Sequence, residues 1–106
     1  MSTPTDDRRD LLTVVANMRA KPGMEQELRD ALVALVEPTS QEDGFVNYDL
    51  HEAVDDPALF YLYENWESAD ALAADLATPH LQDFAARIDK LPAEPGLTIA
   101  RLRRIA

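Results

Sequence analysis

The chain has 106 residues, of which 46% are hydrophobic and 28% charged, a size and balance typical of one soluble globular domain. Its formal net charge of −10 disfavours nucleic acid and anionic lipid as partners, because both bind clustered Lys and Arg. The absence of cysteine excludes disulfides, thiolate metal sites and cysteine nucleophiles, and it fits a cytoplasmic protein without membrane contact.

The first half of the chain predicts one strand and one helix. Residues 1–10 are polar and predict a flexible tail rather than a secretory signal, so that residues 11–106 form a single domain. Apolar and polar residues alternate over Leu11–Ala20, which predicts a strand. Met24–Glu37 has apolar residues at helical spacing and predicts a helix that ends at Pro38.

The second half predicts a hairpin, an interrupted helix and a last strand. Phe45–Ala53 and Leu59–Trp66 are separated by a short turn and predict an antiparallel pair. Ser68 is the expected N-cap of the helix that follows, and Thr78-Pro79 is expected to restart that helix. Residues 97–105 predict the final strand.

The resulting order, β-α-β-β-α-β, predicts an α+β, ferredoxin-like fold with a four-stranded antiparallel sheet. Two helices of this length cover one face of such a sheet, yet both faces of the first and third strands are substantially apolar. We therefore expect a homodimer that packs sheet to sheet, in the manner of a dimeric α/β barrel.

Three residue types are unusual for their positions. Trp66, the only tryptophan, is expected either in the core or in the wall of a pocket, and Asn65 should point the opposite way unless a bulge re-aims it. Asn17 lies in an apolar strand, where its amide either satisfies nearby backbone or faces a cavity. His80, at a helix start, is either structural or a neutral proton acceptor, whereas His51 is expected at the surface. Asp55, Asp56 and the many glutamates are expected to be solvated, and no metal-binding spacing is present.

Four short stretches, in this order and spacing, resemble the antibiotic biosynthesis monooxygenase family, including its quinol monooxygenase branch. They are Ala16–Gly23, Glu42–Tyr48, Tyr63–Ser68 and Leu76–Leu81. The resemblance implies a dimeric ferredoxin-like fold with a pocket between sheet and helices, and an oxidation by O2 that needs neither metal nor flavin.

The resemblance also assigns roles to particular residues. Asn17, Asn65 and Trp66 match positions that bind and deprotonate the substrate in anthrone-oxidising members. Asp75 stands where many members have a histidine, which puts an acid–base step through that histidine in doubt. Asp75 and Ala85 also replace the Trp and His of haem-degrading members, so haem is disfavoured as a substrate.

The hypothesis drawn from these observations is a cofactor-independent monooxygenase that oxidises a quinol, anthrone or related phenolic polyketide with O2. Its expected catalytic residues are Asn17, Asn65, Trp66 and His80, and its expected substrate-contacting residues are Tyr48, Tyr63, Leu72, Leu76 and Phe84. The alternatives are a non-catalytic dimeric module that binds a small molecule, and an isomerase or lyase of a small oxygenated metabolite.

Overall fold

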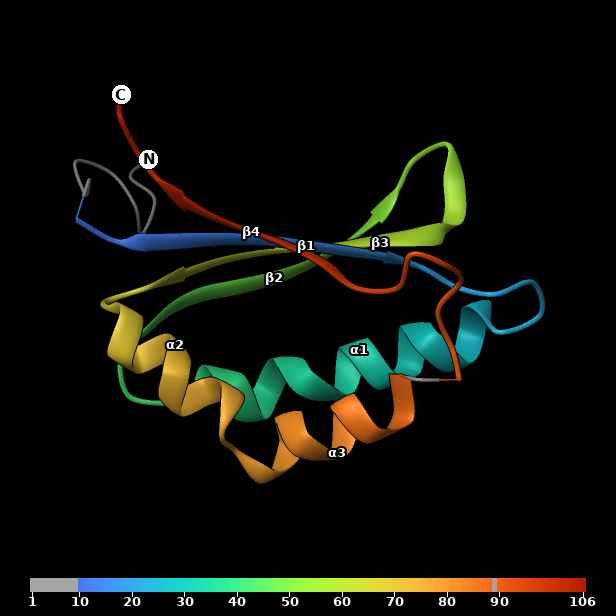
Figure 1. Ribbon diagram of the computed structural model, residues 1–106, viewed down its shortest axis with the longest axis horizontal. Coiled ribbons are helices and arrows are strands. Elements are labelled where there is room, and N and C mark those ends of the chain that lie inside the picture. The colour runs from blue at the N-terminus through green and yellow to red at the C-terminus, as the bar shows by residue number, and fades with distance from the viewer. Residues whose placement is uncertain (1–9, 89) are drawn as a thin grey trace.

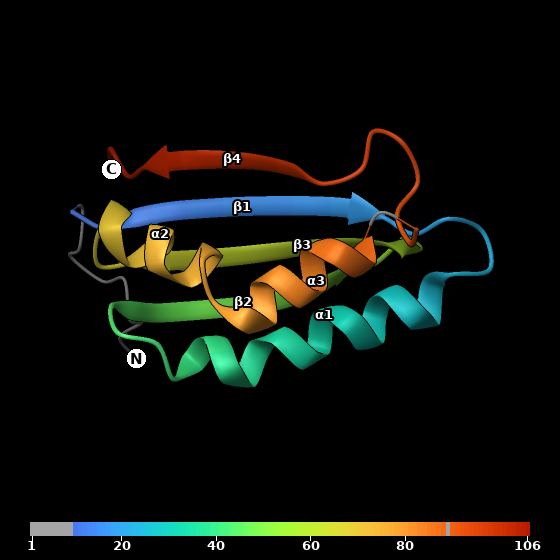
Figure 2. The ribbon, with the colours of Figure 1, turned by 60° about the horizontal axis from the view of Figure 1, so that its bottom comes forward.

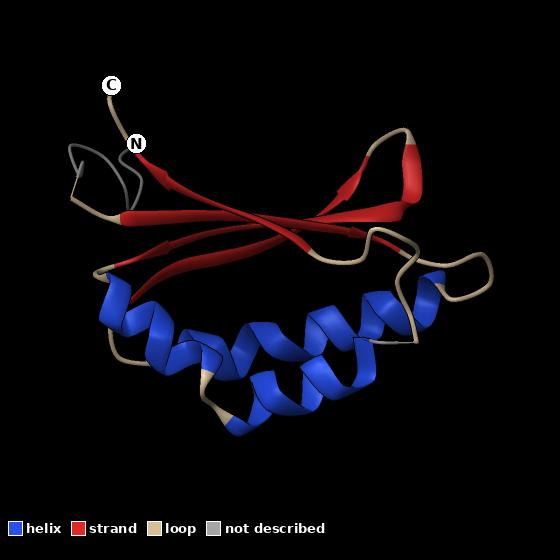
Figure 3. Cartoon of the chain, viewed as in Figure 1, coloured by secondary structure: helices blue, strands red, loops and turns tan. Residues whose placement is uncertain are grey.

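The computed structural model describes residues 10–88 and 90–106 and forms two layers, a four-stranded sheet and three helices packed on one of its faces (Figures 1 and 3). The elements in chain order are β1 (Leu12–Arg19), α1 (Glu25–Ser40), β2 (Phe45–Ala53), β3 (Asp56–Trp66), α2 (Ala69–Leu76), α3 (Pro79–Ile88) and β4 (Thr98–Arg103). The predicted ferredoxin-like fold is confirmed, with the second helix divided into α2 and α3. The predicted tail lies, apart from Asp10, outside the described residues.

The sheet has the strand order β2-β3-β1-β4, and its neighbouring strands are all antiparallel. In Figure 2 the three helices lie over β1, β3 and β2, whereas β4 forms the far edge with no helix in front of it. All six residues of β4 are correspondingly exposed. The edge strand beside β1 is therefore the least covered part of the sheet.

Alternation along β1 and β3 puts one set of side chains against the helices. Val14, Ala16 and Met18 of β1 are buried there, as are Phe60 and Leu62 of β3. They meet a stripe of buried residues on α1, namely Leu28, Ala31, Leu32 and Leu35. The 3.6-residue period of α1 and the two-residue period of the strands thus build one core between the layers.

The α1 helix is longer than predicted, because it continues through Pro38 to Ser40. A proline inside a helix removes one backbone hydrogen bond and usually ends the helix near that point. Here the turn closes beyond it, since the Gln41 N–H donates to the Pro38 carbonyl at 3.2 Å and the Glu42 N–H to that of Thr39 at 3.1 Å. Thr39 is fully buried, which anchors this last turn to the core.

The connection after α1 ends at Gly44, which has a φ of +80° and lies against α2. A Cβ atom at this position would be 2.4 Å from the Cβ of Ala71, so the close approach requires glycine. The Glu67 N–H also donates to the Gly44 carbonyl at 2.8 Å. The start of β2 is thereby held against the start of α2.

Both predicted helix starts after β3 are found in the structure. The Ser68 hydroxyl accepts a hydrogen bond from the Ala71 N–H at 3.1 Å, which is the expected N-cap of α2. The helix is interrupted after Leu76 and restarts at Pro79.

In the described part of the chain, no helix is both long and apolar enough to cross a bilayer.

Candidate active site

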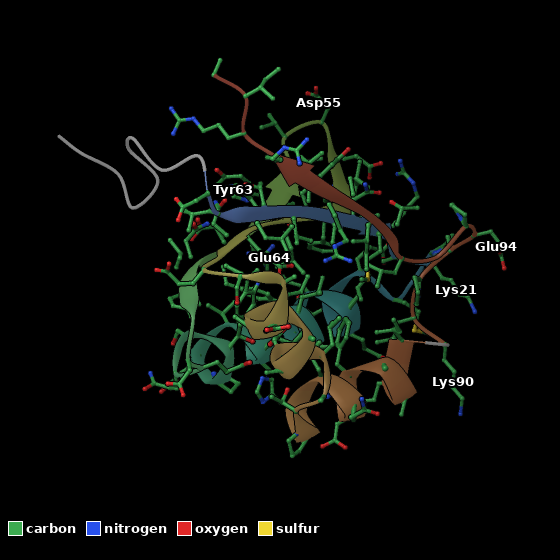
Figure 4. The ribbon with its side chains drawn as sticks, turned by 60° about the vertical axis from the view of Figure 1, so that its left-hand side comes forward. Lys21, Asp55, Tyr63, Glu64, Lys90 and Glu94 are labelled. Atoms are coloured by element: carbon green, nitrogen blue, oxygen red, sulfur yellow. The ribbon has the colours of Figure 1, made fainter. Side chains whose placement is uncertain are left out.

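The end of β3 directs consecutive side chains to opposite faces of the sheet. Glu64 and Trp66 are buried on the helix-covered face, whereas Tyr63 and Asn65 lie on the other face, which we call the open face. Figure 4 shows Tyr63 and Glu64 on the two sides of the sheet. A register shift occurs in the neighbouring strand β2, between Phe45 and Asn47, but it does not turn Asn65 toward the helices.

Asn65 is the centre of a polar row that crosses three strands on the open face. Its Oδ1 accepts a hydrogen bond from the Thr13 hydroxyl at 2.5 Å, and its Nδ2 donates to Asn47 Oδ1 at 3.0 Å. The three residues are register partners in β1, β3 and β2. Asn65 is only 1% exposed, so this row satisfies a buried amide within the sheet.

Asn17 also lies on the open face, because it alternates with the buried Ala16 and Met18 of β1. The four predicted catalytic residues therefore do not meet in one pocket. Asn17 and Asn65 lie on one face of the sheet, and Trp66 and His80 lie on the side of the helices. The physical reason is the two-residue period of a strand, which separates neighbours such as Asn65 and Trp66.

A cavity of about 200 Å³ lies between the sheet and the helices α2 and α3. Its wall is mainly apolar, and its polar side chains are Tyr48, Glu64, Asp75 and Arg101. Four of the five predicted substrate-contacting residues line it, namely Tyr48, Leu72, Leu76 and Phe84. Tyr63 does not, because it is 40% exposed on the open face.

Glu64 is the polar group of β3 that faces this cavity. Its side chain is 5% exposed, and its Oε1 accepts a hydrogen bond from the indole N–H of Trp66 at 3.0 Å. Burial raises the pKa of Glu64 to about 6, although the hydrogen bond from Trp66 opposes this shift. The carboxyl group is thus able to exchange a proton close to neutral pH.

Trp66 holds the carboxyl group of Glu64 without lining the cavity itself. The indole is completely buried, and its ring meets that of Phe45 edge to face, with centroids 6.3 Å apart and an interplanar angle of 84°. Trp66 is not among the residues that line the cavity. In this structure it is a core residue whose one polar atom holds Glu64.

A second buried carboxyl group, Asp75, enters the cavity from α2. Asp75 is 2% exposed, and burial together with the hydrogen bond and charge of Glu42 raises its pKa above the usual range. Burial and the surrounding carboxylates likewise raise the pKa of the Tyr48 phenol, which also lines the cavity. The cavity wall therefore combines an apolar surface with acidic groups that resist ionisation.

His80 lies next to Asp75, at the beginning of α3. Its Nε2 is 2.9 Å from Glu42 Oε2, 3.9 Å from Asp75 Oδ1 and 3.1 Å from the hydroxyl oxygen of Thr78. Thr78 Oγ1 itself donates to the backbone carbonyl of Asp75 at 2.7 Å. His80 thus contacts the cavity residue Asp75 without lining the cavity itself, and it is held by Glu42 and by Thr78 in the α2–α3 break.

The expectation that the glutamates are solvated is wrong for Glu64, and Glu42 is also mostly buried, with 14% of its side chain exposed. Asp75 is buried as well. One signal for Glu64 was available, since it alternates with Leu62 and Trp66 on β3. No sequence signal places Glu42 beside His80, because the two are 38 residues apart. The expectation that His51 is exposed is confirmed.

Comparison with known proteins gives a consistent result. The family model described as antibiotic biosynthesis monooxygenase matches residues 11–87. Rv0793 of Mycobacterium tuberculosis, which is named as a candidate monooxygenase, is 33% identical over 84 residues, or 79% of this chain and 82% of that protein. YcnE of Bacillus subtilis, named in the same way, is 28% identical over 85 residues, or 80% of this chain and 90% of that protein.

The crystal structure of PA3566 from Pseudomonas aeruginosa has a TM-score of 0.86 and 35% identity to this chain, covering 92% of this chain and 96% of that one. The predicted family resemblance is therefore confirmed by both sequence and structure. The chain belongs to the antibiotic biosynthesis monooxygenase family.

Proposed function

We propose that this protein is a monooxygenase that oxidises a small hydroquinone or related phenol with O2. The family supports an activity of the monooxygenase type. The observation that carries the finer proposal is Glu64, a buried carboxyl group with a pKa of about 6 in the wall of a mainly apolar cavity. Such a group matches the task of taking a proton from a phenolic substrate near neutral pH.

The chemistry follows from the substrate once that proton is removed. A phenolate is electron-rich and can pass an electron to O2 without help from a flavin or metal. One oxygen atom enters the ring, the other leaves as water, and the substrate supplies the two electrons and two hydrogens that the water requires. In this scheme Glu64 accepts the phenolic proton and the Trp66 indole N–H holds its carboxylate in place at 3.0 Å.

The size of the cavity supports a substrate of one or two rings. Pockets for drug-sized ligands usually measure about 300–1,000 Å³, and an apolar cavity of about 150 Å³ is able to hold benzene. The cavity between the sheet and α2–α3 measures about 200 Å³. A three-ring anthrone is accordingly a less suitable substrate than a benzene or naphthalene hydroquinone.

The charge of the wall supports a neutral substrate with hydroxyl groups. Glu64 lies in the wall, and its ionised carboxylate would repel a carboxylate or phosphate on the ligand. Tyr48 offers a phenol hydroxyl, and Arg101 at the β4 edge is the single cationic side chain among the described lining residues. Hydroxyl groups on the ligand could donate to the Glu64 carboxylate and accept from these two.

Oxygen uptake tests this proposal. Purified protein is expected to consume O2 with benzene and naphthalene hydroquinones, faster than with an anthrone, and to place one atom of 18O2 in each product molecule. Uptake no faster than that of the protein-free control would reject it. Turnover that persists without O2 would instead support the alternative of an isomerase or lyase, and ligand binding without turnover would support a binding module.

We also propose that the protein is a cytoplasmic homodimer that pairs through the open face. That face carries Tyr61, Tyr63 and Leu102, which are 39%, 40% and 45% exposed, together with the partly buried Val15. Apolar surface of this kind is usually covered in a folded protein.

Sedimentation is expected to give the mass of a dimer, and Tyr63→Lys is expected to shift the protein toward monomer, because it would bury a charge in the interface. Val54→Lys serves as a control, since Val54 is 99% exposed in the turn between β2 and β3. A wild-type monomer, or equal dimerisation of both variants, would reject pairing through this face.

A further inference from the structure

Glu42, Asp75 and His80 come from three separate segments and converge beside the cavity. Glu42 lies in the connection before β2, Asp75 in the last turn of α2, and His80 in the first turn of α3. One oxygen of each carboxyl group and one imidazole nitrogen lie within 4.8 Å of one another. We propose that these three side chains form a binding site for one divalent transition-metal cation, which joins the α1–β2 connection to the α2–α3 break.

The buried oxygen of Asp75 is the independent observation that points to a ligand. Asp75 is 2% exposed, and within the described residues its Oδ1 has no hydrogen-bond partner. Leaving such an oxygen unsatisfied in the interior is unfavourable, because its lost contact with water is not replaced. This same oxygen is the one that lies 3.9 Å from His80 Nε2, so it is directed into the cluster.

The electrostatics of the cluster also favour a cation. Two carboxyl groups in a site that excludes most water repel each other, and the nearby Glu64 adds to this repulsion at Asp75. A proton shared between Glu42 and Asp75 relieves part of this repulsion. A divalent cation would compensate both charges and bind Asp75 Oδ1.

The donor set selects the class of ion. An imidazole nitrogen suits Zn²⁺, Fe²⁺ or Ni²⁺, and carboxylate oxygens suit harder ions such as Mn²⁺, so the mixed set indicates a first-row divalent metal rather than Ca²⁺. Bonds of about 2.0–2.2 Å would separate ligand atoms by about 3–4 Å. The observed separations of 2.9 Å and 3.9 Å from His80 Nε2 are close to this range.

The position of His80 beside the two carboxyl groups is fixed by its neighbours. The Thr78 hydroxyl lies 3.1 Å from Nε2 and is itself fixed by the backbone of Asp75. Three protein ligands leave coordination positions for water, as in other open metal sites. The proposed oxidation, in which Glu64 accepts the phenolic proton, does not use this ion. The metal-binding proposal and the proposed function can therefore be tested independently.

Metal titration of the chelator-treated protein without a polyhistidine tag tests the inference. Calorimetry with Zn²⁺ and visible absorption with Co²⁺ are expected to give one ion per chain. Asp75→Asn and His80→Gln are each expected to weaken binding at least tenfold, since each removes a ligand. His51→Gln is the matched control, because it removes an exposed histidine from β2 and is expected to bind as wild type does.

Thermal unfolding provides a second measurement that needs no substrate. Zn²⁺ is expected to raise the unfolding midpoint of wild type and of His51→Gln, and to raise that of Asp75→Asn much less at the same concentration. Asp75→Asn should fold, because an amide at this position can donate to Glu42. The inference is overturned if wild type binds no metal at micromolar concentration, in which case a shared proton alone holds the cluster, or if Asp75→Asn binds as tightly as wild type.

Discussion

The Glu64→Gln variant is expected to oxidise a hydroquinone about 10²–10⁴-fold more slowly than wild type near pH 7, the usual contribution of a positioned general base. Glutamine has nearly the same shape, and its amide oxygen can still accept the hydrogen bond from the Trp66 indole. The variant should therefore fold and retain the cavity while losing the proton acceptor. Oxygen-uptake rates, measured beside those of Glu67→Gln at an exposed position three residues further on, check this expectation.

The pH dependence of kcat/KM tests the role of Glu64 more directly. Only the ionised carboxylate accepts a proton, so kcat/KM of wild type should fall about tenfold per pH unit below the pKa of about 6 and level off above it. Glu64→Gln should lack this inflection. An unchanged profile in the variant would assign the proton transfer to another group.

The free energy of unfolding should depend on pH through the same pKa of Glu64, and this dependence can be measured without substrate. The pKa of Glu64 is raised from 4.5 to about 6 on folding, so the folded state holds this proton more tightly than the unfolded state. The tighter binding of this proton in the folded state stabilises the protein fully below pH 4.5, and the stabilisation is lost as the pH rises through about 6. The loss should approach about 2 kcal/mol in the free energy of unfolding, and Glu64→Gln should not show it.

Trp66→Ala is expected to lower the free energy of unfolding by about 3–5 kcal/mol, the usual cost of removing a buried large aromatic side chain. The indole is completely buried, and its loss would leave a void beside Phe45 and an unpaired oxygen on Glu64. Because Trp66 is the only tryptophan, urea unfolding of the variant must be followed by circular dichroism rather than by tryptophan fluorescence. Val33→Ala, at a half-exposed position on α1, should cost far less.

Trp66→Phe separates packing from hydrogen bonding at the same position. Phenylalanine fills much of the space but cannot donate to Glu64, and that hydrogen bond is what lowers the pKa of Glu64 against the effect of burial. The inflection of the pH–rate profile should consequently move above pH 6. An inflection that stays in place would mean that Trp66 does not position Glu64.

The fold could be predicted from the sequence because its signals are local. Alternation over β1 and β3 reveals which residues face the core, and Ser68 and Thr78-Pro79 mark the helix starts within a few residues of where they occur. The end of α1 could not be predicted from Pro38 alone, since the turn beyond it is closed by backbone contacts and a buried Thr39.

The candidate site was predicted less completely. Its apolar wall followed from helix and strand periodicity, as the lining positions of Leu72 and Phe84 illustrate. Its acidic groups were not predicted, because glutamate and aspartate are usually solvated, although the alternation of Glu64 with Leu62 and Trp66 was a signal for one of them. The contact of Glu42 with His80 depends on tertiary packing across 38 residues, which no local pattern encodes.

The close approach at Gly44 has a consequence for redesign of the protein. Gly44 is pressed against Ala71 of α2 and lies two residues beyond Glu42, so a rigid contact fixes the position of that carboxylate. Libraries that diversify the exposed Gln41 and Asp43 should therefore leave the Glu42–His80 contact intact. A side chain introduced at residue 44 would lift the whole connection from α2 and carry Glu42 away from its partners.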